Sequence, residues 1–592
     1  MKKLLFFLRD YKKETVLAPL FKMLEASFEL MIPLVVQSIV DVGIANDDRG
    51  YVAWMCLVMI ALGVIGLASS VTAQYFSARA AVGFATRIRH SLFAHMQSLS
   101  YAQSDQIGTS TMITRMTSDI NQLQNGVNMV LRLFLRSPFI VLGAMVMAFT
   151  IDIKAALIFV VVIPLLSIVV FGIMLITIPL YKKVQSGLDR VLGITRGNLT
   201  GVRVIRAFHK EEEEVREFNE GNESLTHMQM FVGRISAVMN PFTYVIINGG
   251  LVVLLWTGAL QVEAGILTQG AVMALVNYMS QILVELIKLA NLIITINKAV
   301  ACGNRVESVL EMVPDMEQGS AEEEAEIESE TETGAETRAP YAVEFDHVSL
   351  TYPGAGGESL TDIDLRVKKG QTIGIIGGTG CGKSSLVNLI PRFYEATRGV
   401  VRVDGIPVEK YSLPGLRRKI GVVPQKAVLF KGTIRDNLKM GREDASEEEI
   451  RSALEISQSA EFVDSRPEGL ETQISQGGKN LSGGQRQRLT IARALVRQPK
   501  ILILDDSASA LDYATDAALR RAISGMKDAP TVFIVSQRAS SLLHADQIVV
   551  LDDGKVAGMG THENLLRECA VYQEIYYSQY PDQRPVQGEV TA

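Results

Sequence analysis

Six apolar stretches dominate the first half of this 592-residue chain. Each is close to the roughly 20 residues that a helix needs to cross a bilayer. Hydrophobic residues make up 48% of the sequence, a share that argues against a disordered or nucleic-acid-wrapping protein. We therefore predict an α-helical transmembrane domain over residues 1–310 that lies in a lipid bilayer. We expect no nucleic acid among the partners of the chain. The spans are expected near residues 17–42, 52–76, 133–151, 155–180, 241–261 and 269–297.

The links between these stretches differ in length and charge. Residues 43–51, 152–154 and 262–268 are short, whereas 77–132 and 181–240 are long, polar and patterned like helices. Long helical extensions are our prediction for the two long links, and ordinary loops are the alternative. Basic side chains gather in the long links and at the N-terminus, which the positive-inside rule places in the cytoplasm together with the C-terminus. They include Arg87, Arg89, Arg115, Lys182, Lys183, Arg203 and Arg206.

Two acidic residues fall in the middle of expected spans. Glu29 lies in the first span and Glu285 in the sixth, with Lys288 about one helical turn beyond Glu285. Ionisable groups inside a membrane are costly, so by default they face a cavity or a partner. Two interpretations remain: a polar, cation-attracting transport cavity, or a structural ion pair between helices.

An acidic segment separates the two halves of the chain. Residues 311–340 hold eleven acidic residues and one basic residue, Arg338. A segment with one dominant charge and few apolar residues cannot bury a core. We interpret it as a flexible linker, so the net charge of −6 says little about the two domains beside it.

The pattern changes after this linker. Short β-branched runs alternate with helix-length segments over residues 341–580, which predicts an α/β domain with a parallel sheet, followed by a tail over 581–592. A strand at 371–376 leads into a glycine-rich loop and then a helix, the spacing of a phosphate-binding P-loop. Lys383 would neutralise phosphate charge, and the Ser384 hydroxyl would bind Mg²⁺. The loop and its first helical residues are Gly377, Gly378, Thr379, Gly380, Cys381, Gly382, Lys383, Ser384 and Ser385.

A second apolar strand, at 500–504, ends in two acids. Asp505 is placed to hold Mg²⁺, directly or through water. Asp506 is placed to orient an attacking water.

The run LSGGQ at 481–485 follows the P-loop in the sequence and is specific to one family. With it, the chain resembles an ABC transporter over nearly its whole length. The resemblance implies that Tyr352 stacks on adenine and that Gln425 links Mg²⁺ to the membrane domain. It also implies that Ser509–Asp512 contacts a partner nucleotide domain. The signature residues expected to touch nucleotide are Ser482, Gly483, Gly484 and Gln485, with Asp512 beside them.

Six spans ahead of one nucleotide domain resemble a half-transporter of the exporter type. In that family two nucleotide domains meet head to tail, and each ATP lies between one P-loop and the partner's signature. Short coupling helices at the tips of the intracellular links carry nucleotide-domain closure to the spans. By position we expect them near Arg115–Gln122 and His209–Arg216.

Two positions depart from the family pattern. The position after the metal-binding aspartate normally holds glutamate, and here it is Asp506. The position of the family's switch histidine holds Gln537, which can hydrogen-bond but cannot carry a positive charge. Both changes in one site resemble the degenerate subunit of a heterodimeric bacterial exporter, whose partner supplies glutamate and histidine.

The sequence thus predicts a multi-pass subunit of an ATP-driven exporter in a bacterial cytoplasmic membrane, with its nucleotide domain in the cytoplasm. Its cofactors would be ATP and Mg²⁺, and its cargo hydrophobic or amphipathic compounds of the multidrug type. Alternatives are a homodimeric exporter of lipid or peptide with two slow sites, and a non-transporting regulatory subunit.

Overall fold

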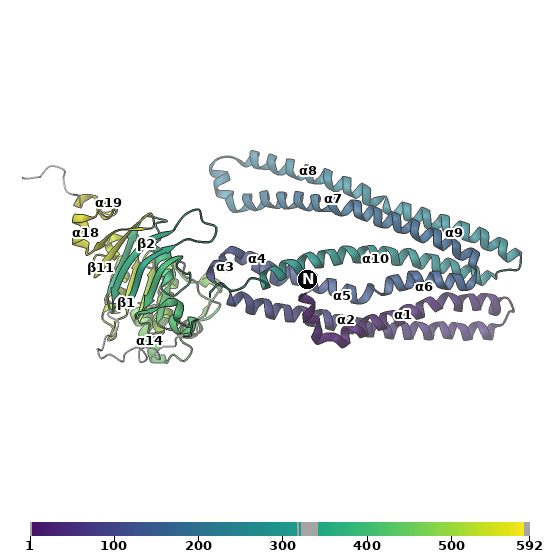
Figure 1. The fold of residues 1–592 in the computed structure, drawn as a ribbon, viewed down its shortest axis with the longest axis horizontal. Coiled ribbons are helices and arrows are strands. Elements are labelled where there is room, and N and C mark those ends of the chain that lie inside the picture. Colours follow the sequence, from purple (N-terminus) through teal and green to yellow (C-terminus); the bar gives the residue numbers. More distant parts are fainter. Residues whose placement is uncertain (1–2, 317–318, 321–340, 585–592) are drawn as a thin grey trace, which may run out of the picture. The chain divides into compact units, whose positions relative to one another are not determined.

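The computed structural model describes residues 3–316, 319–320 and 341–584 (Figure 1). Most of the predicted acidic linker and the end of the predicted tail lie outside these residues. The chain divides into two compact units. We call Met1–Gln97 with Ser110–Met312 the helical unit, and Ser98–Thr109 with Val313–Ala592 the sheet unit.

The helical unit is built from long helices, as predicted for the fold class. Among the described residues, six helical stretches are long and apolar enough to cross a membrane, and each contains one expected span. The first of them, Leu4–Ile44, begins with a 3-10 helix at Leu4–Tyr11 and ends with a π-helical segment at Ile39–Ile44. The helices are α1 (Lys12–Ser38), α2 (Arg49–Ser98), α4 (Thr109–Thr114), α5 (Ile120–Leu133), α6 (Arg136–Ile151), α7 (Ile153–Ala207), α8 (Glu211–Ala237), α9 (Met239–Glu263) and α10 (Gln269–Leu310).

Helix α10 is the centre of the helical unit, and it packs against α1, α5, α6, α7 and α9 (Figure 1). Small residues permit the closest approach: a Cβ added to Gly126 of α5 would lie 2.2 Å from the Cβ of Ala299. Large apolar side chains such as Trp256 and Ile168 remain exposed on the outside. An apolar exterior, with small residues where two helices approach most closely, is the packing expected of helices in lipid.

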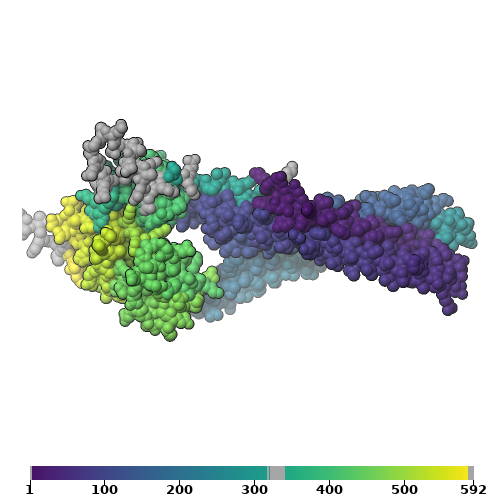
Figure 2. All heavy atoms as spheres, turned by 90° about the horizontal axis from the view of Figure 1, so that it is seen from below, coloured from purple at the N-terminus to yellow at the C-terminus, as the bar shows by residue number. Residues whose placement is uncertain are grey.

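Helices α1 and α2 run side by side along one face of the helical unit, seen in purple in Figure 2. The rings of Phe21 and Phe76 stack with centroids 6.2 Å apart. Lys22 is buried in this interface, where its Nζ donates to Ser70 Oγ at 2.9 Å and pairs with Glu25. The N-terminal hairpin is thus held by polar as well as apolar contacts.

The sheet unit contains two larger sheets. An antiparallel sheet has the order β2-β1-β4-β5, and a six-stranded sheet has the order β12-β11-β3-β10-β9-β6, with β11, β3, β10, β9 and β6 parallel. Strands β7 (Gly432–Thr433) and β8 (Gln473–Ile474) form a small separate pair. The other strands are β1 (Tyr341–Leu350), β2 (Leu360–Lys368), β3 (Thr372–Gly377), β4 (Arg398–Val403), β5 (Ile406–Pro407), β6 (Ile420–Val423), β9 (Ile501–Asp505), β10 (Thr531–Val535), β11 (Gln547–Asp552) and β12 (Lys555–Gly560).

Helices and apolar strands form two cores in the sheet unit, one on each side of the parallel strands. Strands β3, β9 and β10 are almost wholly buried, as expected for parallel strands covered on both faces. The helices are α3 (Tyr101–Ile107), α11 (Lys383–Leu389), α12 (Leu413–Arg418), α13 (Ile434–Lys439), α14 (Glu447–Ile456), α15 (Ala460–Asp464), α16 (Gly483–Val496), α17 (Tyr513–Ser524), α18 (His562–Glu568) and α19 (Ala570–Gln579).

Candidate functional site

The carboxyl ends of four neighbouring parallel strands carry most of the residues that the sequence singled out. Strand β3 leads into the glycine-rich loop, β9 ends at Asp505, β10 leads to Gln537 and β6 leads to Gln425. Carboxyl ends of parallel strands meet at one edge of a sheet, which is where ligands of α/β proteins bind. Strand pairing therefore gathers these four segments at one edge.

The glycine-rich loop has the backbone geometry of a phosphate cradle. Gly382 has φ +94°, and a Cβ there would lie 2.7 Å from the carbonyl oxygen of Ser359, so only glycine fits. Lys383, which begins α11, is 8% exposed and donates from Nζ to the carbonyl oxygens of Gly377 and Gly378, at 3.0 and 2.6 Å. A buried ammonium at a helix N-terminus makes this loop strongly attractive to anions. Thr379, Gly380 and Cys381 complete the turn.

Asp505 and Ser384 meet across the loop. Ser384 Oγ donates to Asp505 Oδ1 at 3.0 Å, and Asp505 is 8% exposed. Burial raises the pKa of the Asp505 carboxyl, neighbouring Asp506 raises it further, and the Ser384 hydrogen bond and Lys383 oppose them. A buried carboxylate beside a hydroxyl lacks full charge compensation, and oxygen ligands of this type suit Mg²⁺. The residues present therefore fit a magnesium ion.

Asp506 follows in a left-handed backbone conformation, with φ +47°. Its N–H donates to the carbonyl oxygen of Val535 at 3.0 Å, which fixes the backbone against β10. Gln425 Nε2 donates to Asp506 Oδ2 at 3.4 Å, so these two of the three predicted catalytic residues, Asp506, Gln537 and Gln425, meet.

Gln537 is positioned by a contact that sequence reasoning missed. Gln579, at the end of α19, donates from Nε2 to the Gln537 carbonyl oxygen at 2.7 Å. The same amide accepts from the N–H of Ala539 at 2.9 Å. The C-terminal helix therefore clamps the loop after β10, while the Gln537 side chain stays exposed. No local sequence signal connects positions 42 residues apart.

The signature run begins helix α16. Ser482 is its N-cap in a capping box: Ser482 Oγ accepts from the Gln485 N–H at 3.2 Å, and Gln485 Oε1 accepts from the Ser482 N–H at 3.0 Å. Gly483 and Gly484 form the first turn, and a Cβ on Gly484 would lie 3.2 Å from the Ala510 carbonyl oxygen. Asp512 caps α17 and accepts from the Thr515 N–H, which lowers its pKa. Both capped helices present their N-termini at exposed residues.

Tyr352 starts a chain of aromatic contacts. Its hydroxyl donates to Ser385 Oγ at 2.9 Å, and its ring meets Tyr394 edge-on at 5.0 Å. Tyr394 donates to Asp105 of α3 at 2.7 Å, and Tyr101 of α3 stacks on the neighbouring Phe393 at 4.5 Å. Burial and the Asp105 hydrogen bond raise the pKa of Tyr394, so it stays a donor at neutral pH.

The segment predicted as the first coupling helix does not belong to the sheet unit, whereas helix α3 does. The segment Arg115–Gln122 belongs to the helical unit, where buried Asp119 pairs with Arg305 of α10 at 2.5 Å and with Arg115 at 2.8 Å. The segment Ser98–Thr109 instead belongs to the sheet unit. The prediction placed the contact about ten residues too late because the chain gives no local sign that Tyr101 and Asp105 have distant partners. Of the second expected segment, His209 and Lys210 lie between α7 and α8, and Glu211–Arg216 form the start of α8.

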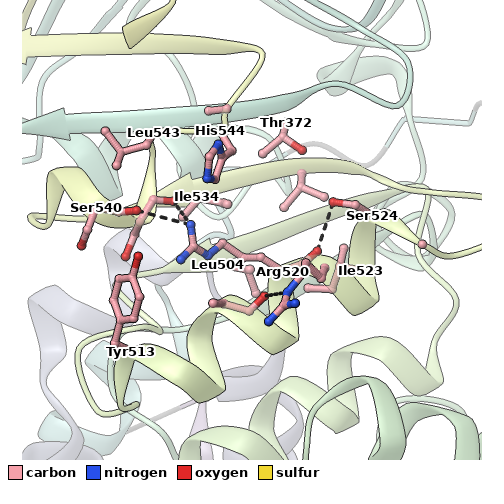
Figure 3. A pocket seen from close by; sticks show the side chains of 16 residues that line it. Thr372, Leu504, Tyr513, Arg520, Ile523, Ser524, Ile534, Ser540, Leu543 and His544 are labelled. Atoms are coloured by element: carbon pink, nitrogen blue, oxygen red, sulfur yellow. Dashed lines mark hydrogen bonds between the residues drawn. The ribbon is translucent and has the colours of Figure 1, made fainter.

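A cavity of about 490 Å³ in the sheet unit lies beside α17, away from the strand edge (Figure 3). Arg520 crosses it and donates to the carbonyl oxygen of Ser541 at 2.9 Å. Tyr513 and His544 line it, together with apolar residues of β9 and β10. The lining residues include none of the predicted site residues.

The acids predicted inside the spans form an ion cluster. Arg136, at the start of α6, donates to Glu285 Oε1 at 2.6 Å and to Glu29 Oε2 at 2.7 Å. Ser137 and Lys288 also donate to Glu285, each at 2.8 Å. These groups therefore form the ion pair between helices that the second interpretation describes. Sequence reasoning missed Arg136, because a basic residue at a span boundary is ordinary.

Comparison with known proteins agrees with this architecture. Residues 15–286 match the family described as "ABC transporter transmembrane region", and residues 360–509 match "ABC transporter". The chain is 36% identical over 581 residues, 98% of its length, to an uncharacterized ABC transporter ATP-binding protein, YfiB, of Bacillus subtilis, of which the match covers 99%.

Other relatives have more specific names. The putative multidrug export ATP-binding/permease protein YgaD of Bacillus subtilis is 31% identical, with 97% of this chain and 98% of that protein covered. The ATP-dependent lipid A-core flippase of Chromobacterium violaceum is 28% identical, with 98% and 97% covered. In fold, the chain resembles a bacterial Atm1-family ABC exporter with ATP bound, at a TM-score of 0.77 and 22% identity, with 96% and 99% covered. With its six long helices, phosphate loop and signature helix, this chain belongs to the ABC transporters, as an exporter-type half-transporter whose ATPase activity is coupled to transport.

Proposed function

We propose that this chain is the degenerate-site subunit of a heterodimeric exporter of hydrophobic or amphipathic compounds. The observation behind the proposal is that the signature motif matches the family whereas two catalytic positions of the nucleotide-binding site do not. The signature helix α16 is intact and fully capped, whereas Asp506 and Gln537 occupy the catalytic strand edge. A partner subunit that supplies glutamate and histidine would complete one competent site.

ATP and Mg²⁺ are bound by the strand edge in this proposal. Tyr352 stacks on adenine, the backbone of 377–385 surrounds the phosphates, and Lys383 neutralises their charge. Ser384, Asp505 and Gln425 would hold Mg²⁺, which supplies charge neutralisation at the terminal phosphates. The hydrogen bond between Ser384 and the buried Asp505 supports this assignment because it leaves an anionic oxygen in need of a cation.

Hydrolysis in this chain's own site would be slow for a geometric reason. Aspartate is one methylene shorter than glutamate, so its carboxylate reaches about 1–1.5 Å less far toward an attacking water, and a 1 Å misplacement can cost about 10²-fold in rate. The hydrogen bond from the Asp506 N–H to Val535 prevents the backbone from moving to compensate. Gln537 adds no positive charge for the transition state.

The intact signature would act in the partner's site. The exposed N-terminus of α16 offers Ser482, Gly484 and Gln485 to the phosphates of an ATP bound by the partner. Asp512 and the adjoining loop would contact that partner. ATP binding would close the pair and turn the spans outward, and hydrolysis in the competent site would reset them.

Cargo and location follow from the spans and the relatives. Exposed aliphatic and aromatic side chains support a membrane-embedded path for apolar compounds, and relatives named for multidrug export and lipid A-core flipping support the same class. The bacterial relatives support a bacterial cytoplasmic membrane. The positive-inside distribution supports an orientation with the sheet unit and both termini in the cytoplasm.

ATPase measurements on the purified chain, alone and with its partner half-transporter, test the proposal. We expect turnover only in the pair. Replacing the partner's catalytic glutamate with glutamine should abolish it, whereas Asp506→Ala should change it less than two-fold. Turnover by the chain alone that Asp506→Ala abolishes would instead support a homodimer with aspartate as the base. ATP-driven uptake of a fluorescent amphipathic dye into inverted vesicles separates an exporter from a regulatory subunit.

The aromatic chain to α3 predicts a coupling defect. Tyr394→Phe keeps the ring beside Tyr352 but removes the hydrogen bond to Asp105, which we expect to contribute about 1 kcal/mol at this exposed acid. Cargo-stimulated ATPase should fall several-fold while ATP affinity stays unchanged. Tyr394→Ala should lower both, and exposed Tyr513→Phe, the matched control, should alter neither. Unchanged stimulation in Tyr394→Phe would exclude this contact from coupling.

A further inference from the structure

We infer that a pocket between α1 and α10 binds the head of a zwitterionic amphipathic molecule. The pocket has a volume of about 430 Å³ and is lined by one stripe of each helix. Glu29 and Pro33 come from α1, and Asn277, Gln281, Glu285 and Lys288 come from α10. The inference rests on the proposed exporter function, because it names the chemistry of one class of cargo.

The charges at one end of the pocket are balanced. Arg136 lies buried between Glu29 and Glu285, and Lys288 pairs with Glu285. Two acids and two bases leave no net charge, so the cluster has no overall preference for a cation. This corrects the interpretation of a cation-attracting cavity. A free cation would meet Arg136 and Lys288, and a free anion would meet the two carboxylates.

Both signs of charge nevertheless remain available to a ligand. The Glu29 side chain is 36% exposed, and among described residues only its Oε2 has a recorded partner. The Lys288 side chain is 41% exposed, and one of its three N–H donors is used by Glu285. Glu29 can therefore accept from a ligand's N–H groups while Lys288 donates to its carboxylate or phosphate. A molecule that carries both groups satisfies both side chains at once.

The rest of the pocket suits a partly apolar body. Ile32, Pro33 and Val36 continue from Glu29 along the same face of α1, toward the Ile39–Ile44 end of the helix. Opposite them, Gln281 has its Oε1 buried without a hydrogen-bond partner in the described part of the chain. An unpaired buried acceptor is costly, and a ligand donor would satisfy it. The pocket therefore offers a charged end, an unsatisfied amide and an apolar wall.

Purely structural charges would not need this arrangement. Buried ion pairs are weak contributors to stability, and apolar residues of similar volume often replace them without loss. Ionisable groups retained within spans therefore indicate a functional surface by default. Here the two most exposed members, Glu29 and Lys288, line the pocket together with the buried Glu285. The buried Arg136 pairs with both acids and holds them in place.

Three dyes with one ring system test the charge preference directly. Rhodamine 110 carries amines and a free carboxylate, rhodamine 123 has that carboxylate esterified, and fluorescein has the carboxylate without amines. Binding is measured by fluorescence anisotropy on the purified full chain in nanodiscs, without ATP. We expect rhodamine 110 to bind about ten-fold more tightly than either other dye, the effect of one added charge-assisted contact. Equal affinities, or tighter binding of rhodamine 123 or fluorescein than of rhodamine 110, would overturn the inference.

Two substitutions assign the preference to the pocket. Lys288→Gln should weaken the binding of rhodamine 110 about ten-fold and leave the binding of rhodamine 123 unchanged. Lys288→Arg should keep the wild-type difference in affinity between the two dyes. Glu29→Gln should bring rhodamine 110 down to the affinity of fluorescein. Lys298→Gln and Glu263→Gln, exposed residues outside the pocket, serve as matched controls. If Lys288→Gln and Glu29→Gln behave like these controls, the pocket is not the binding site.

The wild-type dye ranking decides the inference even if a variant fails to fold, and retained ATP binding reports folding of each variant. The experiment requires no transport. A protein that exports dyes yet shows no zwitterion preference would leave the proposed function standing and remove only this inference.

Discussion

Arg136→Met should destabilise the helical unit more than any other single substitution in the spans. Glu285 is 2% exposed, and it would lose its closest cation while remaining buried. Breaking a buried pair from one side costs about 3–5 kcal/mol, which corresponds to a fall in melting temperature on the order of 10 °C. The measurement is thermal unfolding of the detergent-purified chain, followed by loss of the monodisperse peak in size-exclusion chromatography.

The reason for this expectation is charge imbalance rather than lost packing, and a triple variant separates the two. Glu29→Gln and Glu285→Gln added to Arg136→Met remove the uncompensated acids, so most of the stability should return. Lys288 can turn toward solvent because it is 41% exposed. Lys298→Met, an exposed α10 lysine, should shift the midpoint by less than about 2 °C. If Arg136→Met melts like this control, the cluster does not hold the helical unit together.

Restoring the family residues in the strand edge should produce the second large effect. We expect Asp506→Glu with Gln537→His to raise hydrolysis in this chain's own site about 10²-fold. The Asp506 backbone is held by Val535, so glutamate would extend the carboxylate from the same origin. The φ of +47° makes the site less tolerant of a longer side chain, and a small loss of stability should accompany the gain.

The measurement requires a background in which only this site can act. The partner's catalytic glutamate is replaced by glutamine, and single-turnover hydrolysis of radiolabelled ATP is followed in the pair. Asp528→Glu, in an exposed turn, is the matched control. A rate that stays at the wild-type level in the double variant would mean that the site is slow for a reason other than these two side chains.

The strand edge could be predicted well because its parts are local in sequence. A glycine-rich loop needs only its own spacing and the strand before it, and Asp505 needs only the apolar run that it ends. Parallel pairing of β3, β10, β9 and β6 then brings these local signals together. The six long helices were equally predictable, because each carries its own apolar length.

Contacts between distant segments could not be predicted in the same way. Tyr394 and Asp105 are 289 positions apart, and Arg136 and Glu285 are 149 apart. An aromatic residue on a short helix, or an arginine at a span boundary, has many possible partners until the fold selects one. The sequence therefore identified Glu29 and Glu285 as unusual but not the arginine between them. It also placed a contact with the nucleotide domain at Arg115–Gln122, whereas the segment that belongs to the sheet unit contains α3.

Helix α3 has a consequence for how this protein can be recombined with its relatives. Its residues are encoded between two membrane helices, yet they belong to the sheet unit. A chimera that exchanges only Val313–Ala592 would leave Tyr101 and Asp105 facing a foreign surface. Exchange of Ser98–Thr109 together with the C-terminal segment transplants a self-consistent module. Natural recombination at a single breakpoint would separate the two pieces, so we expect substitutions at Tyr101, Asp105, Phe393 and Tyr394 to be inherited together among relatives.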